Sequence, residues 1–446
     1  MRGRALLLLC AAGCAGQEGT IQIELVTAPG SDLLERIERA RLTLSNPSEV
    51  VEAERDENGQ LSLSLDVVAE GESGFARLEG FDAGGDRIAL GLSAVLPVAA
   101  VDAAIALYIA PPLSFAEAPI ALEPARSEAA GTLLQYGAVI AGGRDADGDP
   151  IGSLVIYNVY DHQLQIGLDL PEPRAQITAV SGVSDFIYLF GGLDGDGDPS
   201  ADAWRFDTSV SPAGIYVPLV TPDSLARAGA AAAWAGNETF FVAGDPPAEM
   251  DAARVTAIGD PVSADGAAAA TIASITAAQP VLVVGAGVGT TGAAIFQSGA
   301  LREIEGPPEL QRNGCALLAL PDGRLLALGG ADPAGTPLAS GVLYDPATAA
   351  FTVVDDLLTT PRLAAAIAVT SDVIVVAGGT DASGTARADA EILDAADLDA
   401  IDVLPLAGAR VGGLALPLGN RQVLLASGSD DTGAPLGRLE LFTPAE

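Results

Sequence analysis

The chain has 446 residues, 49% of them hydrophobic, and a formal net charge of −37. A surface this acidic repels the phosphates of nucleic acids and of anionic lipids, so we expect no nucleic-acid partner. With one histidine and three cysteines, the chain also lacks the residues for a histidine-rich metal centre or a disulfide framework.

Residues 1–13 are predicted to be an export signal, because two early arginines precede a run of leucines. Ala11-Ala12-Gly13-Cys14 resembles a bacterial lipobox, which implies cleavage before Cys14 and lipid on its sulfur and amine. Ala15 follows where inner-membrane lipoproteins carry Asp, so we expect the cell envelope, at the outer membrane. The membrane would be contacted through the lipid alone. The alternative is an ordinary secretory signal and a secreted protein.

Residues 20–112 are predicted to form a separate domain. Thr20–Val26 and Leu61–Leu65 alternate between apolar and polar residues, as half-buried strands do. A small antiparallel β-sandwich of immunoglobulin-like or transthyretin-like type fits this pattern. Pro111-Pro112 then marks a stiff linker.

The rest of the chain repeats about every 50 residues, a period typical of radially repeated β units. Each repeat has a hydrophobic run that ends in a doublet of small residues. The doublets are Gly142-Gly143, Gly191-Gly192, Ala243-Gly244, Gly285-Ala286, Gly329-Gly330, Gly378-Gly379 and Ser427-Gly428.

Two further markers keep register with the doublets. A large apolar residue follows most of them, and an arginine precedes all but the fourth, where Ala268 and Ala269 stand instead. The arginines are Arg126, Arg174, Arg227, Arg312, Arg362 and Arg410. One arginine per repeat favours a structural bond to a carbonyl or carboxylate of a neighbouring blade. The alternative is a row of arginines that binds anions.

Gly329-Gly330, followed by Tyr344-Asp345-Pro346 and Phe351, resembles the kelch repeat. The resemblance implies a β-propeller over residues 118–446 with one four-stranded blade per repeat. We expect seven blades, with six as the alternative. The last repeat ends after its third strand, so Pro119–Leu122 is predicted to supply the fourth strand and close the ring.

Aspartates alternate in the loops after the first two doublets. Asp194, Asp196, Asp198 and Asp202 have the spacing of calcium loops in integrin-type propellers, and Asp145, Asp147, Asp149 and Ser153 repeat it. Alternate residues of a tight loop can direct oxygens toward a hard cation. Calcium is therefore a possible cofactor, although such runs also form ordinary polar turns.

Two other residues, His162 and Cys315, are of types that often act in catalysis, but a non-catalytic role is expected for both. His162 lies in a predicted turn and is expected to be solvated. Cys315 lies in an apolar run and is expected to be a small buried hydrophobe.

These patterns predict a lipid-anchored, surface-exposed, non-catalytic protein that binds an unknown protein or glycan through propeller loops. One alternative is a carbohydrate-active enzyme with paired acidic residues in the propeller axis. The other is a structural envelope protein stiffened by calcium.

Overall fold

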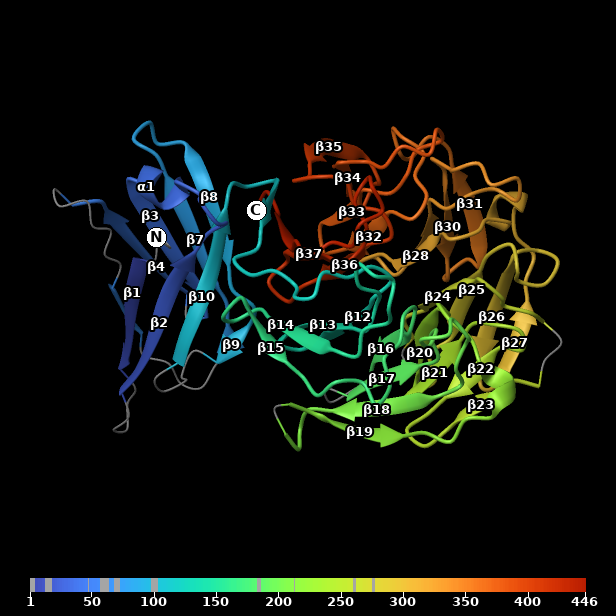
Figure 1. Cartoon of the computed structure of the whole chain (residues 1–446). Coiled ribbons are helices and arrows are strands. Elements are labelled where there is room, and N and C mark those ends of the chain that lie inside the picture. Colours follow the sequence, from blue (N-terminus) through green and yellow to red (C-terminus); the bar gives the residue numbers. More distant parts are fainter. Residues whose placement is uncertain are drawn as a thin grey trace.

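The computed structural model describes residues 5–12, 18–46, 48–56, 64–67, 73–97, 103–182, 186–211, 213–259, 262–274 and 277–446. Within these ranges the chain is all-β, as predicted, with one short helix, α1 (Leu33–Arg36), and two 3-10 turns, η1 (Asp223–Leu225) and η2 (Pro308–Leu310). Figure 1 shows an N-terminal domain in blue beside a larger array of sheets coloured from cyan to red. Among the described residues, no helix is long and apolar enough to cross a membrane.

Eight described strands of the N-terminal domain are hydrogen-bonded in one order. They are β4 (Ser48–Glu54), β3 (Arg39–Ser45), β7 (Ala76–Phe81), β8 (Arg87–Leu92), β10 (Ala103–Ala110), β2 (Glu18–Val26), β1 (Ala5–Ala12) and β5 (Ser64–Val67). A short pair, β6 (Ser73–Gly74) and β9 (Leu96–Pro97), lies apart from them. The alternating burial along β3 and β7 is what a strand with one face on a core requires.

Strands from both halves of this order share one core. Leu25 of β2 and Leu107 of β10 are buried in the same cluster as Leu42 of β3 and Leu78 of β7. The sheet is mixed, whereas the sequence predicted antiparallel strands: β10 runs parallel to β2, and β1 runs parallel to β5. A parallel pair needs a long connection, and most of the domain lies between β2 and β10. The immunoglobulin-like or transthyretin-like sandwich stays a prediction.

The described residues from 114 onward form four-stranded antiparallel sheets, consistent with a β-propeller-like fold. The sheets are numbered in chain order by their first strand, and the first three are the following: first, β12 (Ala130–Leu134), β13 (Gly137–Ala141), β14 (Leu154–Asn158), β15 (Gln163–Ile166); second, β16 (Thr178–Ser181), β17 (Phe186–Phe190), β18 (Ala203–Asp207), β19 (Ile215–Pro218); third, β20 (Ala232–Gly236), β21 (Thr239–Val242), β22 (Ala248–Met250), β23 (Val255–Ala257). The next three are the fourth, β24 (Ala268–Thr271), β25 (Val281–Val284), β26 (Ala293–Gln297), β27 (Ala300–Glu303); the fifth, β28 (Ala316–Ala319), β29 (Leu325–Leu328), β30 (Gly341–Asp345), β31 (Ala350–Val354); and the sixth, β32 (Ala366–Val369), β33 (Val373–Ala377), β34 (Asp389–Asp394), β35 (Ala400–Pro405). The seventh sheet combines β36 (Leu414–Pro417), β37 (Val423–Ala426) and β38 (Glu440–Thr443) with β11 (Ser114–Glu117).

The first strands of successive sheets contact one another from β12 through β36, and β36 contacts β12 again. Figure 1 shows these strands around the middle of the array, with outer strands such as β19, β27 and β31 at its edge. Each pair of adjacent sheets encloses its own hydrophobic cluster, including the pair formed by the seventh and first sheets. We call this closed set of sheets the ring.

The two ends of the ring meet in the seventh sheet. β11 pairs antiparallel with β38, from Ser114 opposite Thr443 to Glu117 opposite Glu440. The closing strand therefore precedes the predicted segment Pro119–Leu122. That segment follows β38 only loosely, with the Leu122 N–H donating to the Gly437 carbonyl at 2.7 Å. Pro119 has no N–H to donate, which is unfavourable inside a ladder.

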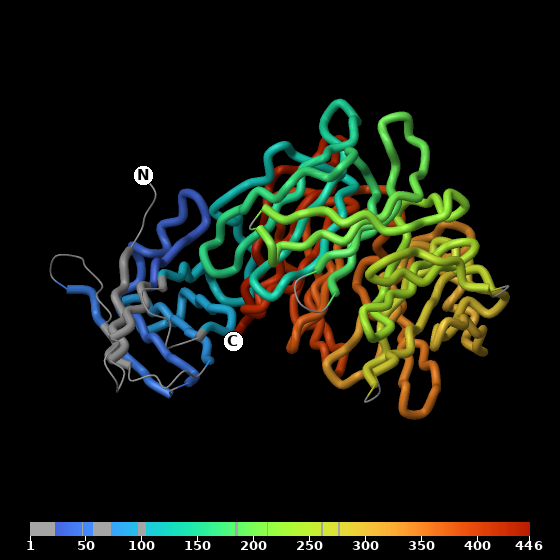
Figure 2. Tube along the Cα trace, turned by 90° about the horizontal axis from the view of Figure 1, so that it is seen from below, coloured from blue at the N-terminus to red at the C-terminus, as the bar shows by residue number. Residues whose placement is uncertain are grey.

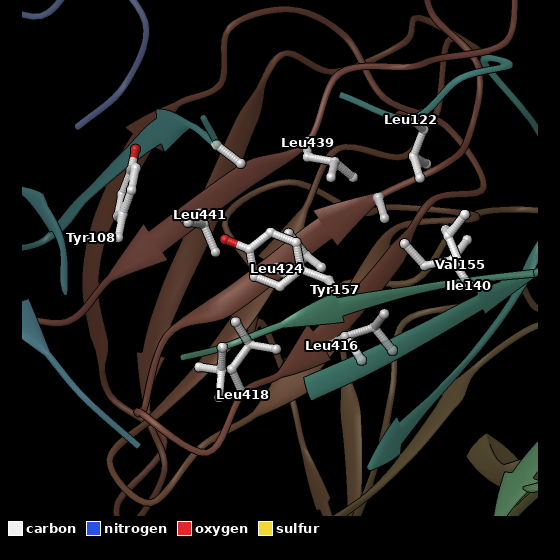
Figure 3. Packing of buried hydrophobic residues seen from close by; sticks show 14 of the residues in the cluster. Tyr108, Leu122, Ile140, Val155, Tyr157, Leu416, Leu418, Leu424, Leu439 and Leu441 are labelled. Atoms are coloured by element: carbon white, nitrogen blue, oxygen red, sulfur yellow. The ribbon is translucent and has the colours of Figure 1, made fainter. Parts of the chain in front are cut away.

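The N-terminal domain packs against the first and seventh sheets (Figure 3). Tyr108 of β10 lies in one apolar cluster with Tyr157 of the first sheet and Leu418, Leu424 and Leu441 of the seventh repeat. Figure 2 shows the C-terminal end of the chain beside the N-terminal domain.

His162 contradicts its sequence-based expectation, because it is fully buried at this interface. It follows β14 in a turn, as predicted, but β10 of the N-terminal domain covers it. The turn itself was visible in the sequence, whereas its cover comes from a strand far away along the chain.

Candidate functional site

The repeated arginines hold the loops of their own sheets. In most repeats the guanidinium donates to the carbonyl of the first doublet residue: Arg126 Nη1 lies 3.2 Å from the Gly142 oxygen, and Arg362 Nη1 lies 3.0 Å from the Gly378 oxygen. Equivalent bonds run from Arg227 to Ala243, from Arg312 to Gly329 and from Arg410 to Ser427. The second residue of the third doublet has to be glycine, because a Cβ atom on Gly244 would lie 2.0 Å from Arg227 Nη1.

The arginine backbone makes the contact between sheets. The Gly143 N–H donates to the Arg174 carbonyl of the next repeat at 2.9 Å, and the Gly192 N–H donates to the Arg227 carbonyl at the same distance. The bond recurs from Ala286 to Arg312 and from Gly379 to Arg410. In the fourth repeat the accepting carbonyl belongs to Ala264. This residue, rather than Ala268 or Ala269, stands at the place of the missing arginine, because β24 already begins at Ala268.

The charge of the arginine is balanced differently from repeat to repeat. Arg362 lies 2.9 Å from Glu391 Oε1 and Arg410 lies 3.1 Å from Glu440 Oε1, and all four side chains are buried. Arg126 is also buried, yet its hydrogen-bond partners are carbonyl oxygens and the Ser153 hydroxyl. Burial without a carboxylate lowers the pKa of Arg126 to about 10.

The burial of the arginines favours the structural interpretation over the anion-binding one. Arg126, Arg312, Arg362 and Arg410 are at most 1% exposed, and Arg174 is 4% exposed, so their guanidiniums do not form a surface for anions. They act as repeated structural bonds, and the contact between neighbouring sheets is made by their carbonyls rather than by their guanidiniums.

The first aspartate of each acidic loop organises that loop. Asp145 Oδ1 accepts the N–H groups of Asp147 and Asp149, both at 3.0 Å, and the Asp194 carboxylate does the same for Asp196 and Asp198. Asp332, Asp381 and Asp430 build equivalent turns in the fifth, sixth and seventh sheets. Such side-chain bonds to the backbone stabilise tight turns.

These bonds change the electrostatics of the carboxylates that make them. The backbone N–H groups of Asp198 and Asp196 hold the pKa of Asp194 below its usual value. The pKa of Asp381 is also lowered, and the largest cause is the hydrogen bond from the Ser383 hydroxyl. For Asp430 the largest cause of the lowered pKa is the hydrogen bond from the Thr432 hydroxyl. Hydrogen bonds to the charged form favour ionisation, so these three carboxylates keep their negative charge at mildly acidic pH.

The structure does not gather the predicted calcium ligands. Asp202 Oδ2 lies 2.8 Å from Arg174 Nη2, and Ser153, at the matching position, binds Arg126. Among the described residues, which include all seven predicted aspartates, no group of three or more His, Cys, Asp or Glu side chains could hold a metal ion. Calcium thus remains an untested prediction, with Asp147, Asp149, Asp196 and Asp198 exposed around loops that are already closed by hydrogen bonds.

The middle of the ring is uncharged. The first strands of the sheets, all within the described part of the chain, contain no acidic or basic residue. A cavity of about 350 Å³ lies against the third, fourth and fifth sheets, where it is lined by glycines, alanines, Leu317 and Cys315. Paired acids, as a glycoside hydrolase needs, have no place on these strands.

Cys315 is half-buried at this cavity rather than fully buried. Burial raises the pKa of its thiol to about 11, so the reactive thiolate is scarce at neutral pH.

Cys14 and the start of the predicted signal lie outside the described residues. The described part of that segment, β1, is the strand between β2 and β5. Cleavage before Cys14 would remove β1 and, among the described pairings, leave β5 without a strand partner.

Sequence reasoning missed the interface role of His162 and the buried partners Glu391 and Glu440. The sequence could have indicated the glutamates, since each follows its arginine at nearly the same distance in the last two repeats. No protein-family model matches this chain, and no curated protein matches it.

Proposed function

We propose that the chain is a lipid-anchored envelope protein whose seven-bladed, kelch-like propeller binds a partner through its acidic loops. Cys14 would carry the lipid, and the N-terminal domain would be a small sandwich between the anchor and the propeller. The work is binding, without catalysis.

The observation that carries the proposal is the repeated loop after the doublet. Five sheets present the same turn, each built by an aspartate that binds its own backbone. Because the sheets are arranged alike around the ring, equivalent loops open on the same side. The result is a rigid face on which exposed carboxylates such as Asp147 and Asp196 are not used for folding.

The chemistry of this face favours a cationic partner. The loop carboxylates are solvent-exposed, and a net charge of −37 adds a long-range field that attracts basic surfaces. A protein segment rich in arginine or lysine meets these requirements, and a neutral glycan would not use the charge. The uncharged lining of the axis supports binding over the hydrolase alternative.

A charge-matched pair of variants tests the proposal. The face variant carries Asp147→Asn, Asp149→Asn, Asp196→Asn and Asp198→Asn, which leaves the turn-forming Asp145 and Asp194 in place. The control carries Asp32→Asn, Glu35→Gln, Glu49→Gln and Glu54→Gln, at exposed positions of the N-terminal domain. Binding of an oligoarginine peptide is measured by calorimetry at low salt.

We expect the peptide to bind the wild type and the control alike, with at least a tenfold loss of affinity in the face variant. Equal affinities in the face variant and the control would contradict the proposal, because general charge attraction would then explain the binding. Binding of a neutral oligosaccharide that survives in the face variant would favour glycan recognition instead.

A further inference from the structure

The N-terminal domain lies across the seam where the ring closes. On one side of the seam it contacts the first sheet: the Ala106 N–H donates to the Tyr160 carbonyl, and the Tyr160 hydroxyl donates to the Val95 carbonyl, both at 2.6 Å. On the other side it contacts the seventh repeat: Asn420 Nδ2 lies 3.1 Å from the Leu92 oxygen, and Arg87 donates to the Ala445 carbonyl. The domain therefore holds both ends of the ring.

His162 is the polar centre of this contact. The backbone N–H of Tyr108, in β10, points at His162 Nε2 with a separation of 3.3 Å. His162 Nδ1 lies 2.7 Å from the Tyr157 hydroxyl oxygen. A backbone N–H can only donate, so Nε2 must be the acceptor, and the single proton of the neutral ring sits on Nδ1 and is donated to Tyr157.

We propose that the N-terminal domain is an acid-released clasp on the ring, and that protonation of His162 is what loosens it. A proton on Nε2 would face the hydrogen of the Tyr108 N–H. That N–H cannot turn away, because β10 is fixed by its ladder with β2. Protonation therefore replaces a hydrogen bond across the interface with a repulsive contact inside an apolar cluster.

Among the described residues, the groups that hydrogen-bond to the His162 ring carry no charge that compensates for an added proton. β10 contributes Tyr108 and β14 contributes Tyr157, and burial raises the pKa of both phenols, so both stay neutral. The exposed Asp161 in the same turn accepts the Gln163 N–H. The charges of Glu117 and Glu440 add to the raised pKa of Tyr108, and neither carboxylate is a hydrogen-bond partner of His162.

Burial lowers the pKa of His162 from 6.5 to about 4. The pKa in the closed state is therefore below that in the open state, where the ring is solvated. The clasp is fully closed above pH 6.5 and loosens as pH falls toward 4. A difference of about 2.5 pH units corresponds to a shift of the opening equilibrium by up to about 300-fold.

The single histidine of the chain makes the test direct. In full-length protein with Cys10→Ala, Cys14→Ser and Cys315→Ala, which removes all three native cysteines, spin labels on Val50→Cys and Val210→Cys report the distance between the N-terminal domain and the ring. Both positions are well exposed. The imidazole NMR signal of His162 is followed over the same pH range. We expect one distance at pH 7, a second population below pH 6, and an imidazole titration that coincides with its appearance.

Three variants separate His162 from the many carboxylates that also titrate. His162→Gln keeps an acceptor without a titrating ring and should show one distance down to pH 4.5. Tyr160→Phe removes another hydrogen bond across the interface and should keep the pH-dependent opening. Asn420→Ala weakens the clasp without changing the histidine, so opening should begin at a higher pH.

The proposal fails if the wild type and His162→Gln change alike with pH. It also fails if His162 titrates near 6.5 while the distance stays constant, since the ring would then be solvated in the closed state. If His162→Gln does not fold, an unchanged opening pH in Asn420→Ala overturns the proposal in its place.

Discussion

The last two sheets and the first sheet differ in how they balance the charge of a buried arginine. Each buries an arginine under its doublet, but Arg362 and Arg410 have buried glutamates as partners, whereas the hydrogen-bond acceptors of Arg126 are uncharged oxygens. The planar guanidinium has five donors, so carbonyls alone can satisfy its hydrogen bonds. The comparison teaches that the hydrogen bonds from the arginine to backbone carbonyls are the shared requirement of the repeat. The carboxylate partner is present in some repeats only.

Removing a glutamate should have the largest effect. Glu440→Ala leaves Arg410 buried without its carboxylate and also takes the acceptor from Arg438 and from the Ala407 N–H. An uncompensated buried charge typically costs about 3–5 kcal/mol, so we expect a loss of unfolding free energy of this size. Urea denaturation at pH 7 measures it, and a loss below about 1 kcal/mol would show that Arg410 does not need its partner.

Replacing the arginine that lacks a carboxylate should cost less. Arg126→Met removes the buried charge itself and leaves the Gly142 and Ser153 carbonyls without this donor. We expect a loss of about 1–3 kcal/mol, the range for unsatisfied buried acceptors. The comparison breaks if denaturation shows Arg126→Met to be more damaging than Glu440→Ala.

The loop aspartates should have the smallest effect on stability. Asp430→Ala removes the acceptor for the Thr432 and Ala434 N–H groups. Because the pKa of Asp430 is lowered in the folded protein, its contribution is present above the ordinary value of 3.8 and is lost as pH falls below it. Thermal melting should therefore separate the variant from the wild type more widely at pH 7 than at pH 2.5, and Asp430→Asn should lie between them at pH 7.

The lipid anchor should have no effect on the ring. Cys14→Ser should abolish incorporation of labelled palmitate and release the protein from the envelope, while the melting temperature stays unchanged. Labelling that persists in the variant would place the anchor elsewhere.

The repeat was predictable because its markers are local. Doublet, arginine and apolar residue recur at a fixed spacing, and glycine and arginine each have a geometric reason to be there. The Asp loops were visible for the same reason, but the spacing could not show that Asp145 and Asp194 bind their own backbones, or that Asp202 turns to Arg174.

The features that the sequence did not reveal depend on distant partners. His162 looked like a solvated turn residue because β10, which buries it, belongs to another domain. The strand that closes the ring was placed a few residues too late, because Ser114–Glu117 resembles a linker until β38 is beside it. The parallel pairing of β10 with β2 has no local signature either.

Ring closure by the two ends of the ring segment is the central claim, and one cross-link tests it. Ser114 and Thr443 are direct partners in the β11–β38 ladder. Opposite residues of an antiparallel pair have Cα atoms about 4.5–5.5 Å apart, within the range of a disulfide. In a Cys10→Ala, Cys14→Ser, Cys315→Ala background, Ser114→Cys with Thr443→Cys should form a disulfide under mild oxidation, and Ser114→Cys with Val210→Cys should not. Failure of the 114–443 pair to cross-link in folded protein, or cross-linking of residue 120 to 443 instead, would contradict the closure described above.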